Sequence, residues 1–329
     1  MTEIRPATIA DIDELRQLVE RHPYPEYRCY RLFKHDFAAD HLARTVQGLL
    51  EGNCPLAFLA VSDRRVVGFI AATRSEAESA CFALEMASVP FVLCDGAGAA
   101  RIAGVKALLA TLLAAARTRG VQHLTLKVDV ADMTALHAAE QSGYRLVDTL
   151  VTYVDVSARR PRPEPNPAFE MTTYRKAEFD QFTPEEIDPL ADFMRTSYRV
   201  TRFHMDDRLP ADRSGEIYDE WCRNLFNGKW ADMIHVARRA GRTVGFLGHQ
   251  SFGELEERYG VKIIGRGLAG VLPEGRGAYA ALVAATMAHT PDFAEYDTQI
   301  QNFPAINVWI RFGFAFMRGR FTLHRWLDE

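Results

Sequence analysis

The 329-residue chain lacks the features that mark several large classes of protein. It has five cysteines, an odd number, and none of them forms a C-x-x-C pair, which argues against a disulfide framework or a zinc site. The sequence has no H-E-x-x-H pair of histidines and no G-x-S-x-G motif with a matching triad. We therefore expect a site without metal and a reducing, cytoplasmic location.

The chain also has no excess of positive charge and no long apolar run. Its 39 Lys and Arg residues are outnumbered by 43 Asp and Glu residues, for a net charge of −4. The chain as a whole is therefore not drawn to nucleic-acid phosphates. The longest uncharged apolar stretch lies around 107–116, and the first residues show no export signal. We expect no nucleic-acid partner, no membrane and a small-molecule substrate.

What the sequence does contain is the composition of a globular protein large enough for two cores. Hydrophobic residues make up 48% and charged residues 25% of the chain. Near the middle, prolines occupy every second position from Pro161 to Pro167, a spacing that forbids a helix and favours an extended spacer. The predicted division is a first domain at 1–157, a proline-rich linker at 158–168 and a second domain at 169–329.

The two halves share short patterns in the same order. The tripeptide V-G-F occurs at 67–69 and again at 244–246. Later, the pattern D-x-x-A-x-x-x-A-x-x-x-G-Y beginning at Asp132 has a counterpart in N-x-x-A-x-x-x-W-x-x-x-G-F beginning at Asn302. Two ordered similarities indicate an internal duplication.

Apolar periodicity predicts helices and strands in both halves. Residues 9–20 have helical spacing, and 56–61 with 66–71 form a strand pair around a turn. In the second half, a strand at 263–272 precedes a helix at 278–289. We expect an α/β (mixed α+β) fold with two tandem domains, each a mixed, largely antiparallel sheet flanked by helices.

The most informative local pattern is the glycine-containing loop between that strand and helix. The loop reads Pro-Glu-Gly-Arg-Gly-Ala-Tyr over 273–279. A loop of this kind presents free backbone N–H groups and the positive end of a helix dipole to an anion. An ordinary strand-to-helix turn accounts for the same glycines.

The order of strand, glycine loop, helix, strand and N-x-x-A-x-x-x-aromatic-x-x-x-G-F resembles the acyl-CoA-dependent N-acyltransferases of the GNAT superfamily. Their loop pattern is Q/R-x-x-G-x-G/A; Gly277 fits it, whereas Glu274 and Tyr279 depart from it. The resemblance implies acetyl-CoA as co-substrate, with the backbone of 270–272 holding its pantetheine arm. The cofactor-binding residues carried over are Gly270, Val271, Leu272, Glu274, Gly275, Arg276, Gly277, Ala278, Tyr279, Asn302 and Trp309.

The corresponding loop of the first half is degraded. Arg101 and Gly104 are the remnant of the pattern, Lys106 follows where Gly or Ala is expected, and Ala139 replaces the aromatic residue. We expect a catalytically silent, degenerate first domain.

A narrower resemblance lies in residues 202–228, with R-F followed by A-D-x-S-G-x-x-Y-x-x-W-x-x-N and a later Gly. These elements resemble the bacterial dTDP-fucosamine acetyltransferases, which acetylate an amino group on a nucleotide-linked sugar. Tyr218 and Trp221 are also spaced to share one helix face. The predicted substrate-binding residues are Arg202, His204, Asp206, Tyr218 and Trp221.

The predicted catalytic residues are His249, Tyr279 and Asp206. In the resembled enzymes a tyrosine at the position of Trp309 protonates the departing thiolate, but an indole has no acidic proton to give near pH 7. Tyr279 or a water takes that role, or the thiolate leaves unassisted. His249, Asp206, or Glu274 through water accepts the proton of the amine.

Together these observations predict an enzyme, an acyl-CoA-dependent N-acetyltransferase that acts on a primary amine. The narrower resemblance favours a nucleotide-linked amino sugar as acceptor, and a homodimer is compatible with the sequence. The alternatives are a non-catalytic acyl-CoA-binding protein or partner module, and an acetyltransferase for another small-molecule or peptide amine.

Overall fold

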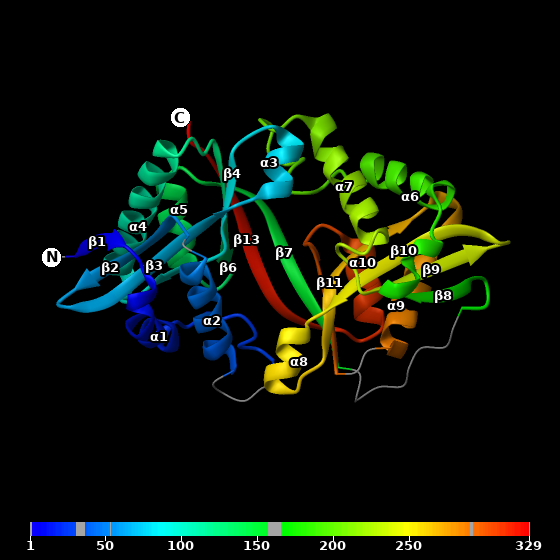
Figure 1. The fold of residues 1–329 in the computed structure, drawn as a ribbon, viewed down its shortest axis with the longest axis horizontal. Coiled ribbons are helices and arrows are strands. Elements are labelled where there is room, and N and C mark those ends of the chain that lie inside the picture. The colour runs from blue at the N-terminus through cyan, green and yellow to red at the C-terminus, as the bar shows by residue number, and fades with distance from the viewer. Residues whose placement is uncertain (1, 31–36, 53, 157–165, 290–291, 329) are drawn as a thin grey trace. The chain divides into compact units, whose positions relative to one another are not determined.

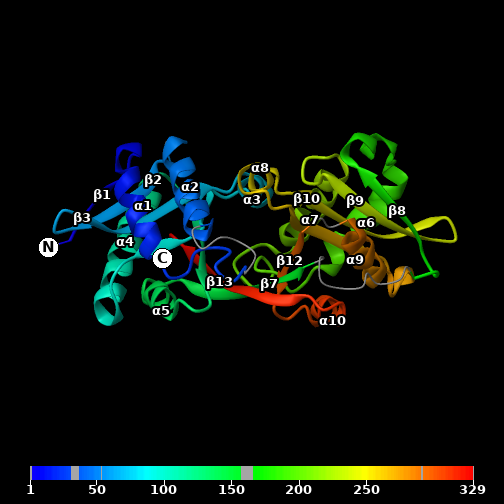
Figure 2. The ribbon, with the colours of Figure 1, turned by 90° about the horizontal axis from the view of Figure 1, so that it is seen from below.

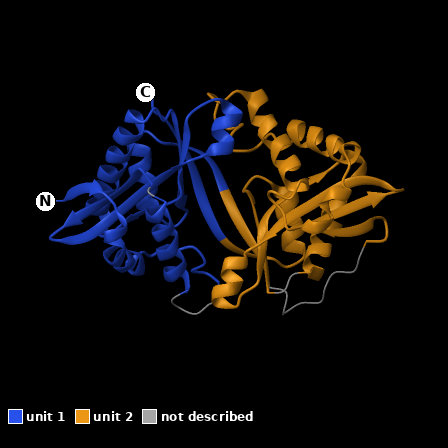
Figure 3. Ribbon diagram, in the orientation of Figure 1, with its two compact units in different colours: residues 1–149, 318–329 blue, residues 150–317 orange. Residues whose placement is uncertain are grey.

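The computed structural model describes residues 2–30, 37–52, 54–156, 166–289 and 292–328. The chain divides into two compact units (Figure 3). Unit 1 comprises residues 1–149 and 318–329, and unit 2 comprises residues 150–317. Most of the predicted linker at 158–168 lies outside the described residues.

Unit 1 is a sheet covered by helices (Figure 1). Its strands have the order β1-β2-β3-β4-β6-β13, with β5 on β3. Its elements are β1 (Glu3–Pro6), η1 (Ile9–Asp11), α1 (Ile12–Arg21), α2 (Phe37–Glu51), β2 (Leu56–Ser62), β3 (Arg65–Arg74), α3 (Glu76–Phe82), β4 (Met86–Val89), β5 (Val92–Cys94), α4 (Gly98–Thr118), β6 (His123–Asp129) and α5 (Met133–Gln141).

Alternation along β2 builds a core on each face of this sheet. Phe58 and its i±2 neighbours pack with α4 and α5, whereas Leu59 packs with α1 and α2. The two helical layers can be followed in Figure 2. By length and composition alone, helix α4 could cross a membrane, and the mean hydropathy of an 18-residue window within it is 1.6. Its residues Leu108 and Leu112 are fully buried in the core of unit 1.

Unit 2 repeats this plan, with the strand order β7-β12-β11-β10-β9-β8. Helices α6 and α7 pack against each other and contact β11, while α9 packs against β9 and β10. Its elements are β8 (Glu170–Arg175), η3 (Lys176–Gln181), α6 (Pro184–Ser197), α7 (Ala211–Phe226), β9 (Met233–Arg239), β10 (Arg242–Ser251), α8 (Gly253–Tyr259), β11 (Ile263–Val271), η4 (Pro273–Gly275), α9 (Ala278–His289), β12 (Phe293–Gln299) and α10 (Phe303–Arg311).

The last strand of each half belongs to the sheet of the other unit. Strand β7 (Arg145–Val156) pairs through 150–156 with β12 of unit 2. Strand β13 (Ala315–Trp326) pairs through 320–326 with β6 of unit 1. The units therefore differ from the predicted contiguous domains 1–157 and 169–329, because the halves exchange their final strands. Pairing between such distant segments leaves no local signal in the sequence.

The duplication inferred from the sequence has structural counterparts. The two V-G-F tripeptides lie in β3 and β10. Asp132 and Asn302 are the N-caps of α5 and α10, and each side chain accepts a hydrogen bond from the backbone N–H three residues on. Both halves therefore use the same helix start at matching positions.

Candidate functional site

The site of unit 2 begins where two parallel strands part. Strands β11 and β12 pair only at Ile263 with Phe293 and at Ile264 with Ala294, although β11 continues to Val271. On its other side, β11 stays paired with β10 as far as Val271. Beyond Ile264, the edge of β11 that faces β12 therefore carries backbone polar groups not engaged in pairing between these two strands.

A cavity of about 700 Å³ opens along this divergence. It is lined by the backbone of 267–271, the end of β12, and residues of α6, α7, α9 and α10. Among the residues predicted from the sequence, those that line it are Gly270, Val271, Gly277, Tyr279, Asn302, Trp309, Tyr218 and Trp221.

The glycine loop requires glycine for two separate reasons. A Cβ at Gly275 would lie 2.5 Å from the carbonyl oxygen of Val244, so the loop packs against β10 only without a side chain. Gly277 has a φ of 94°, which other residues rarely adopt. Glu274 and Arg276 are exposed, and Arg239 donates a hydrogen bond of 2.6 Å to the carbonyl of Glu274. The loop is thus a rigid turn that leads directly into α9.

Trp309 and Tyr279 form a hydrogen-bonded pair in the cavity wall. The indole Nε1 of Trp309 donates to the hydroxyl of Tyr279 over 2.9 Å. Burial raises the pKa of Tyr279 above its ordinary value, so the hydroxyl keeps its proton at neutral pH. Tyr296 stacks on Trp309, with ring centroids 5.6 Å apart. A phenolic O–H is therefore available next to the indole ring.

Aromatic residues from α6 and α7 form another wall. The hydroxyl of Tyr198 donates to the carbonyl of Ala269 in β11 over 2.6 Å, and its ring stacks on Tyr218 at 4.5 Å. Trp221 contacts Tyr218 at 5.0 Å. The indole Nε1 of Trp221 is buried and has no hydrogen-bond partner among the described residues. This wall offers ring faces and a hydrogen-bond donor.

His249 lies away from the cavity. Phe246 and Gly248 of β10 face α7, so the alternate residue His249 faces α9. There it contacts His235, with centroids 5.2 Å apart, and it is 1% exposed. Burial lowers the pKa of His249 to about 4 and that of His235 to about 2. This position corrects the expectation that His249 accepts the proton of the amine.

Three of the predicted acceptor residues also lie outside the cavity lining. Arg202 stacks over Phe203 at 4.2 Å, and His204 bonds to Thr201 through Nδ1 at 2.8 Å. Asp206 is buried and accepts from the backbone of Arg208. The remaining predicted cofactor residues that do not line the cavity are Leu272, Glu274, Gly275, Arg276 and Ala278.

The cavity also includes residues that the sequence did not single out. Asp297 at the end of β12 accepts a hydrogen bond from Thr152, and Arg311 lies at the end of α10. Tyr198 also belongs to this group. One sequence feature could have pointed to a functional role for Asp297. It lies near the carboxyl end of a strand parallel to β11, and ligands bind at the carboxyl ends of strands in open sheets.

Solved structures with a similar arrangement cover nearly the whole chain. A GCN5-related N-acetyltransferase from Sphaerobacter thermophilus aligns over 99% of this chain and 96% of its own, with 16% identity and a TM-score of 0.61. A tandem GNAT protein from the clavulanic acid biosynthesis pathway aligns over 99% of both chains, with 16% identity and a TM-score of 0.57.

The fold is therefore that of the GCN5-related N-acetyltransferases, present twice in one chain. No family model matches the sequence. The chain is 28% identical over 149 residues to the spore coat polysaccharide biosynthesis protein SpsD of Bacillus subtilis. That match covers 44% of this chain and 48% of SpsD, about half of the length of this relative.

Proposed function

We propose that unit 2 transfers an acetyl group from acetyl-CoA to a primary amine. The observation that carries this proposal is the cavity between the parting strands β11 and β12, beside a glycine loop that leads into α9. An extended, amide-containing thiol arm can pair with the open edge of β11 as a further strand would. The N-terminus of α9 then lies where negatively charged phosphates are favoured.

Two contacts hold the backbone of β11 in place for this task. Gly270 packs so closely that a Cβ would lie 2.7 Å from Phe246. Tyr198 holds the carbonyl of Ala269 by its hydroxyl, which fixes the direction of the neighbouring N–H groups. A fixed N–H directed at the thioester oxygen stabilises the negative charge that develops as the amine attacks.

Tyr279 is the proposed proton donor and Asp297 the proposed proton acceptor. The neutral amine nitrogen forms a bond to the thioester carbonyl carbon, and the carbon–sulfur bond then breaks. The Tyr279 hydroxyl gives its proton to the departing thiolate, while Asp297 takes the proton lost by the amine through a water molecule. Solvent restores both groups. Trp309 orients the Tyr279 hydroxyl through its hydrogen bond.

The acceptor is proposed to lie against Tyr218 and Trp221. Tyr218 and Trp221 form an edge-packed pair of aromatic rings, and such rings can bind the apolar face of an amino sugar or the ring of a flat amine. The indole N–H of Trp221 supplies a donor for a hydroxyl or carbonyl of the acceptor. The partial match to a spore coat polysaccharide protein and the sequence pattern at 202–228 support an amino sugar, and a nucleotide-linked one is the acceptor we propose.

The test is thiol release from acetyl-CoA across a panel of amines. The panel contains nucleotide-linked amino sugars, free amino sugars, aminoglycosides and peptides with a free N-terminus. Turnover is expected with the nucleotide-linked sugars, with an N-acetyl product seen by mass spectrometry. If calorimetry shows that coenzyme A binds but no amine is turned over, the proposed enzymatic activity is contradicted. A non-catalytic acyl-CoA-binding protein is then the remaining function. No binding of coenzyme A at all contradicts the proposal as a whole.

A further inference from the structure

Strand β7, which comes from the first half of the sequence, contributes a side chain to the site of unit 2. In the antiparallel pairing of β7 with β12, Thr152 lies directly opposite Asp297. Side chains at such opposed positions point to the same face of the sheet, with Cβ atoms about 5 Å apart. The hydroxyl of Thr152 donates a hydrogen bond to Oδ1 of Asp297. A residue that lines the cavity is thus held by a strand from the other half of the chain.

The two partners of this bond differ in exposure, and the difference shows which one holds the other. Thr152 is 2% exposed and lies within the stretch of β7, 150–156, that is paired with β12. Its branched Cβ restricts the side chain to few conformations. Asp297, in contrast, is an exposed position in a strand that is otherwise buried or half-buried. Thr152 therefore sets the orientation of the Asp297 carboxylate.

The next residue of β7 packs against the tryptophan that orients the proposed proton donor. Tyr153 lies opposite Tyr296 in the register of β7 and β12. The ring centroid of each tyrosine lies 5.6 Å from that of Trp309. Trp309 in turn donates the hydrogen bond to Tyr279. Two successive residues of β7, which point to opposite faces of the sheet, thus support the proposed base and the proposed acid.

The duplicated half of the chain provides an internal comparison for this pair. The offset between the N-caps of α5 and α10 also relates Thr152 to Thr322. The same offset relates Asp297 to Lys127. The register repeats as well, because Thr322 lies opposite Lys127 in the pairing of β13 with β6. Both units therefore have the threonine, but unit 1 has an ammonium group where unit 2 has a carboxylate.

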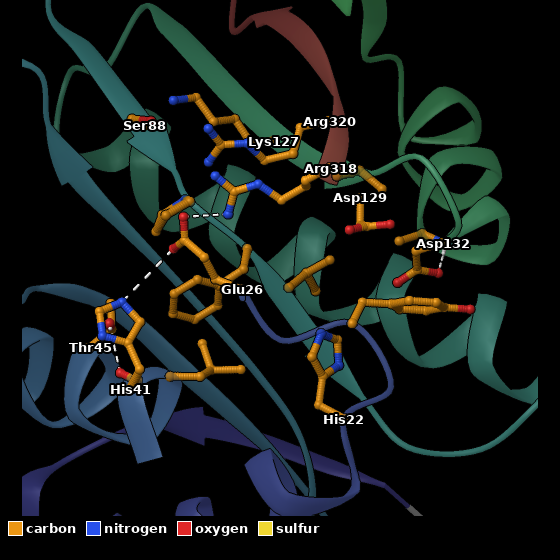
Figure 4. A pocket seen from close by; sticks show the side chains of 17 residues that line it. His22, Glu26, His41, Thr45, Ser88, Lys127, Asp129, Asp132, Arg318 and Arg320 are labelled. Atoms are coloured by element: carbon orange, nitrogen blue, oxygen red, sulfur yellow. Dashed lines mark hydrogen bonds and ion pairs between the residues drawn. The ribbon is translucent and has the colours of Figure 1, made fainter. Parts of the chain in front are cut away.

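Lys127 lines a pocket of about 180 Å³ in unit 1 (Figure 4). An ammonium group donates hydrogen bonds and accepts none, so it does not replace a carboxylate as proton acceptor. The Thr322 hydroxyl is buried and has no hydrogen-bond partner among the described residues. Asp132, which also lines this pocket, is bonded by both Nη atoms of Arg101, at 2.6 and 2.7 Å. The threonine thus recurs in unit 1 without the carboxylate that it holds in unit 2.

We propose that Thr152 is a positioning residue for acetyl transfer in unit 2, where it directs the Asp297 carboxylate towards the acceptor amine. This role rests on the proposed function, in which Asp297 accepts the proton of the amine through water. One hydrogen bond fixes the carboxylate, and the group has further acceptor sites for that water. The first half of the chain then serves catalysis without a reaction of its own, because it supplies the strand that completes the site of unit 2.

Steady-state kinetics of the full chain, with acetyl-CoA and an amine that is turned over, tests this role. Thr152→Val keeps the branched shape and removes the hydroxyl, so it is expected to lower kcat roughly tenfold and to leave the KM for acetyl-CoA unchanged. Thr152→Ser restores the hydroxyl and is expected to recover most of the rate. Thr322→Val makes the same change at the corresponding position of unit 1 and is expected to leave kcat unchanged. Thermal unfolding shows whether each variant is folded.

Asp297→Asn separates the positioning role from the proposed base. It is expected to lower kcat at least about 100-fold, and Thr152→Val in that background is expected to cost less than about a further twofold. Full activity of Thr152→Val, or equal losses in Thr152→Val and Thr322→Val, overturns the positioning role even if Asp297→Asn is inactive. Full activity of Asp297→Asn overturns the base and the positioning role together. Absence of turnover by the wild type with every amine contradicts the proposed function itself.

Discussion

The hydrogen bond between Trp309 and Tyr279 allows the proton donor to be identified by two substitutions that keep both rings. Trp309→Phe removes the indole N–H and leaves an aromatic ring against Tyr296. Tyr279→Phe removes the hydroxyl and leaves its ring in the cavity wall. Both variants are thus expected to fold, and a thermal unfolding measurement checks this.

The expected magnitudes differ because the two groups do different work. A neutral hydrogen bond contributes about 0.5–1.5 kcal/mol, so loss of the Trp309 N–H is expected to lower kcat by less than about tenfold. Loss of a general acid costs about 10²–10⁴-fold, so Tyr279→Phe is expected to lower kcat at least about 100-fold. In the double variant the Trp309 substitution adds almost nothing, because the hydroxyl it orients is already gone.

The assay is thiol release under saturating acetyl-CoA and one amine acceptor, with all four proteins measured together. A large loss at Trp309→Phe with no loss at Tyr279→Phe refutes the assignment, since the indole would then act by another route. Simple multiplication of the two single effects in the double variant refutes the orienting role of Trp309, even if Tyr279 is the acid.

Three further outcomes follow from the geometry. Gly277→Ala forces an L-residue to a φ of 94° and is expected to raise the KM for acetyl-CoA several-fold, whereas Gly253→Ala, with open space at its Cβ, leaves it unchanged. Trp221→Ala is expected to raise the KM for the amine far more than that for acetyl-CoA, and the opposite pattern in initial-rate kinetics contradicts an acceptor role. His249 has a folded pKa near 4 against 6.5 when unfolded, so only the unfolded state takes up its proton as the pH falls through this window. As the pH is lowered from about 6.5 to 4, the free energy of unfolding of the wild type is therefore expected to decrease. The decrease is expected to be steeper than in His249→Gln by up to about 1.4 kcal/mol per pH unit. Urea unfolding at several pH values measures this, with the exposed His137→Gln as control.

The sequence predicted the parts of the structure that local patterns encode. The helix expected at 278–289 is α9, and the strand expected at 263–272 is β11 to within one residue. The duplication was visible because helix caps and glycine turns require particular residues, such as the N-caps Asp132 and Asn302. Tyr218 and Trp221 line the same cavity because their spacing along α7 places them on one face of that helix.

The rest depends on contacts between distant segments. His249 was predicted as a base from its residue type, but the alternation of β10 turns it towards α9 and away from the cavity. Asp297 and Tyr198 line the cavity because β12 and α6 are placed by packing, which no short pattern reports. The ion pair of Arg101 with Asp132 joins residues 31 apart, so the sequence showed only a degraded loop.

The exchange of final strands sets the order in which the protein is completed during synthesis. Residues 320–326 supply the strand that pairs with β6, yet they follow every residue of unit 2 in the chain. While the ribosome makes unit 2, the edge of β6 lacks this strand, and exposed sheet edges are sites of mispairing and aggregation. Unit 2, in contrast, receives β7 before most of its own sheet exists. The sheet of unit 1 therefore cannot be completed until the last residues of β13 have been made.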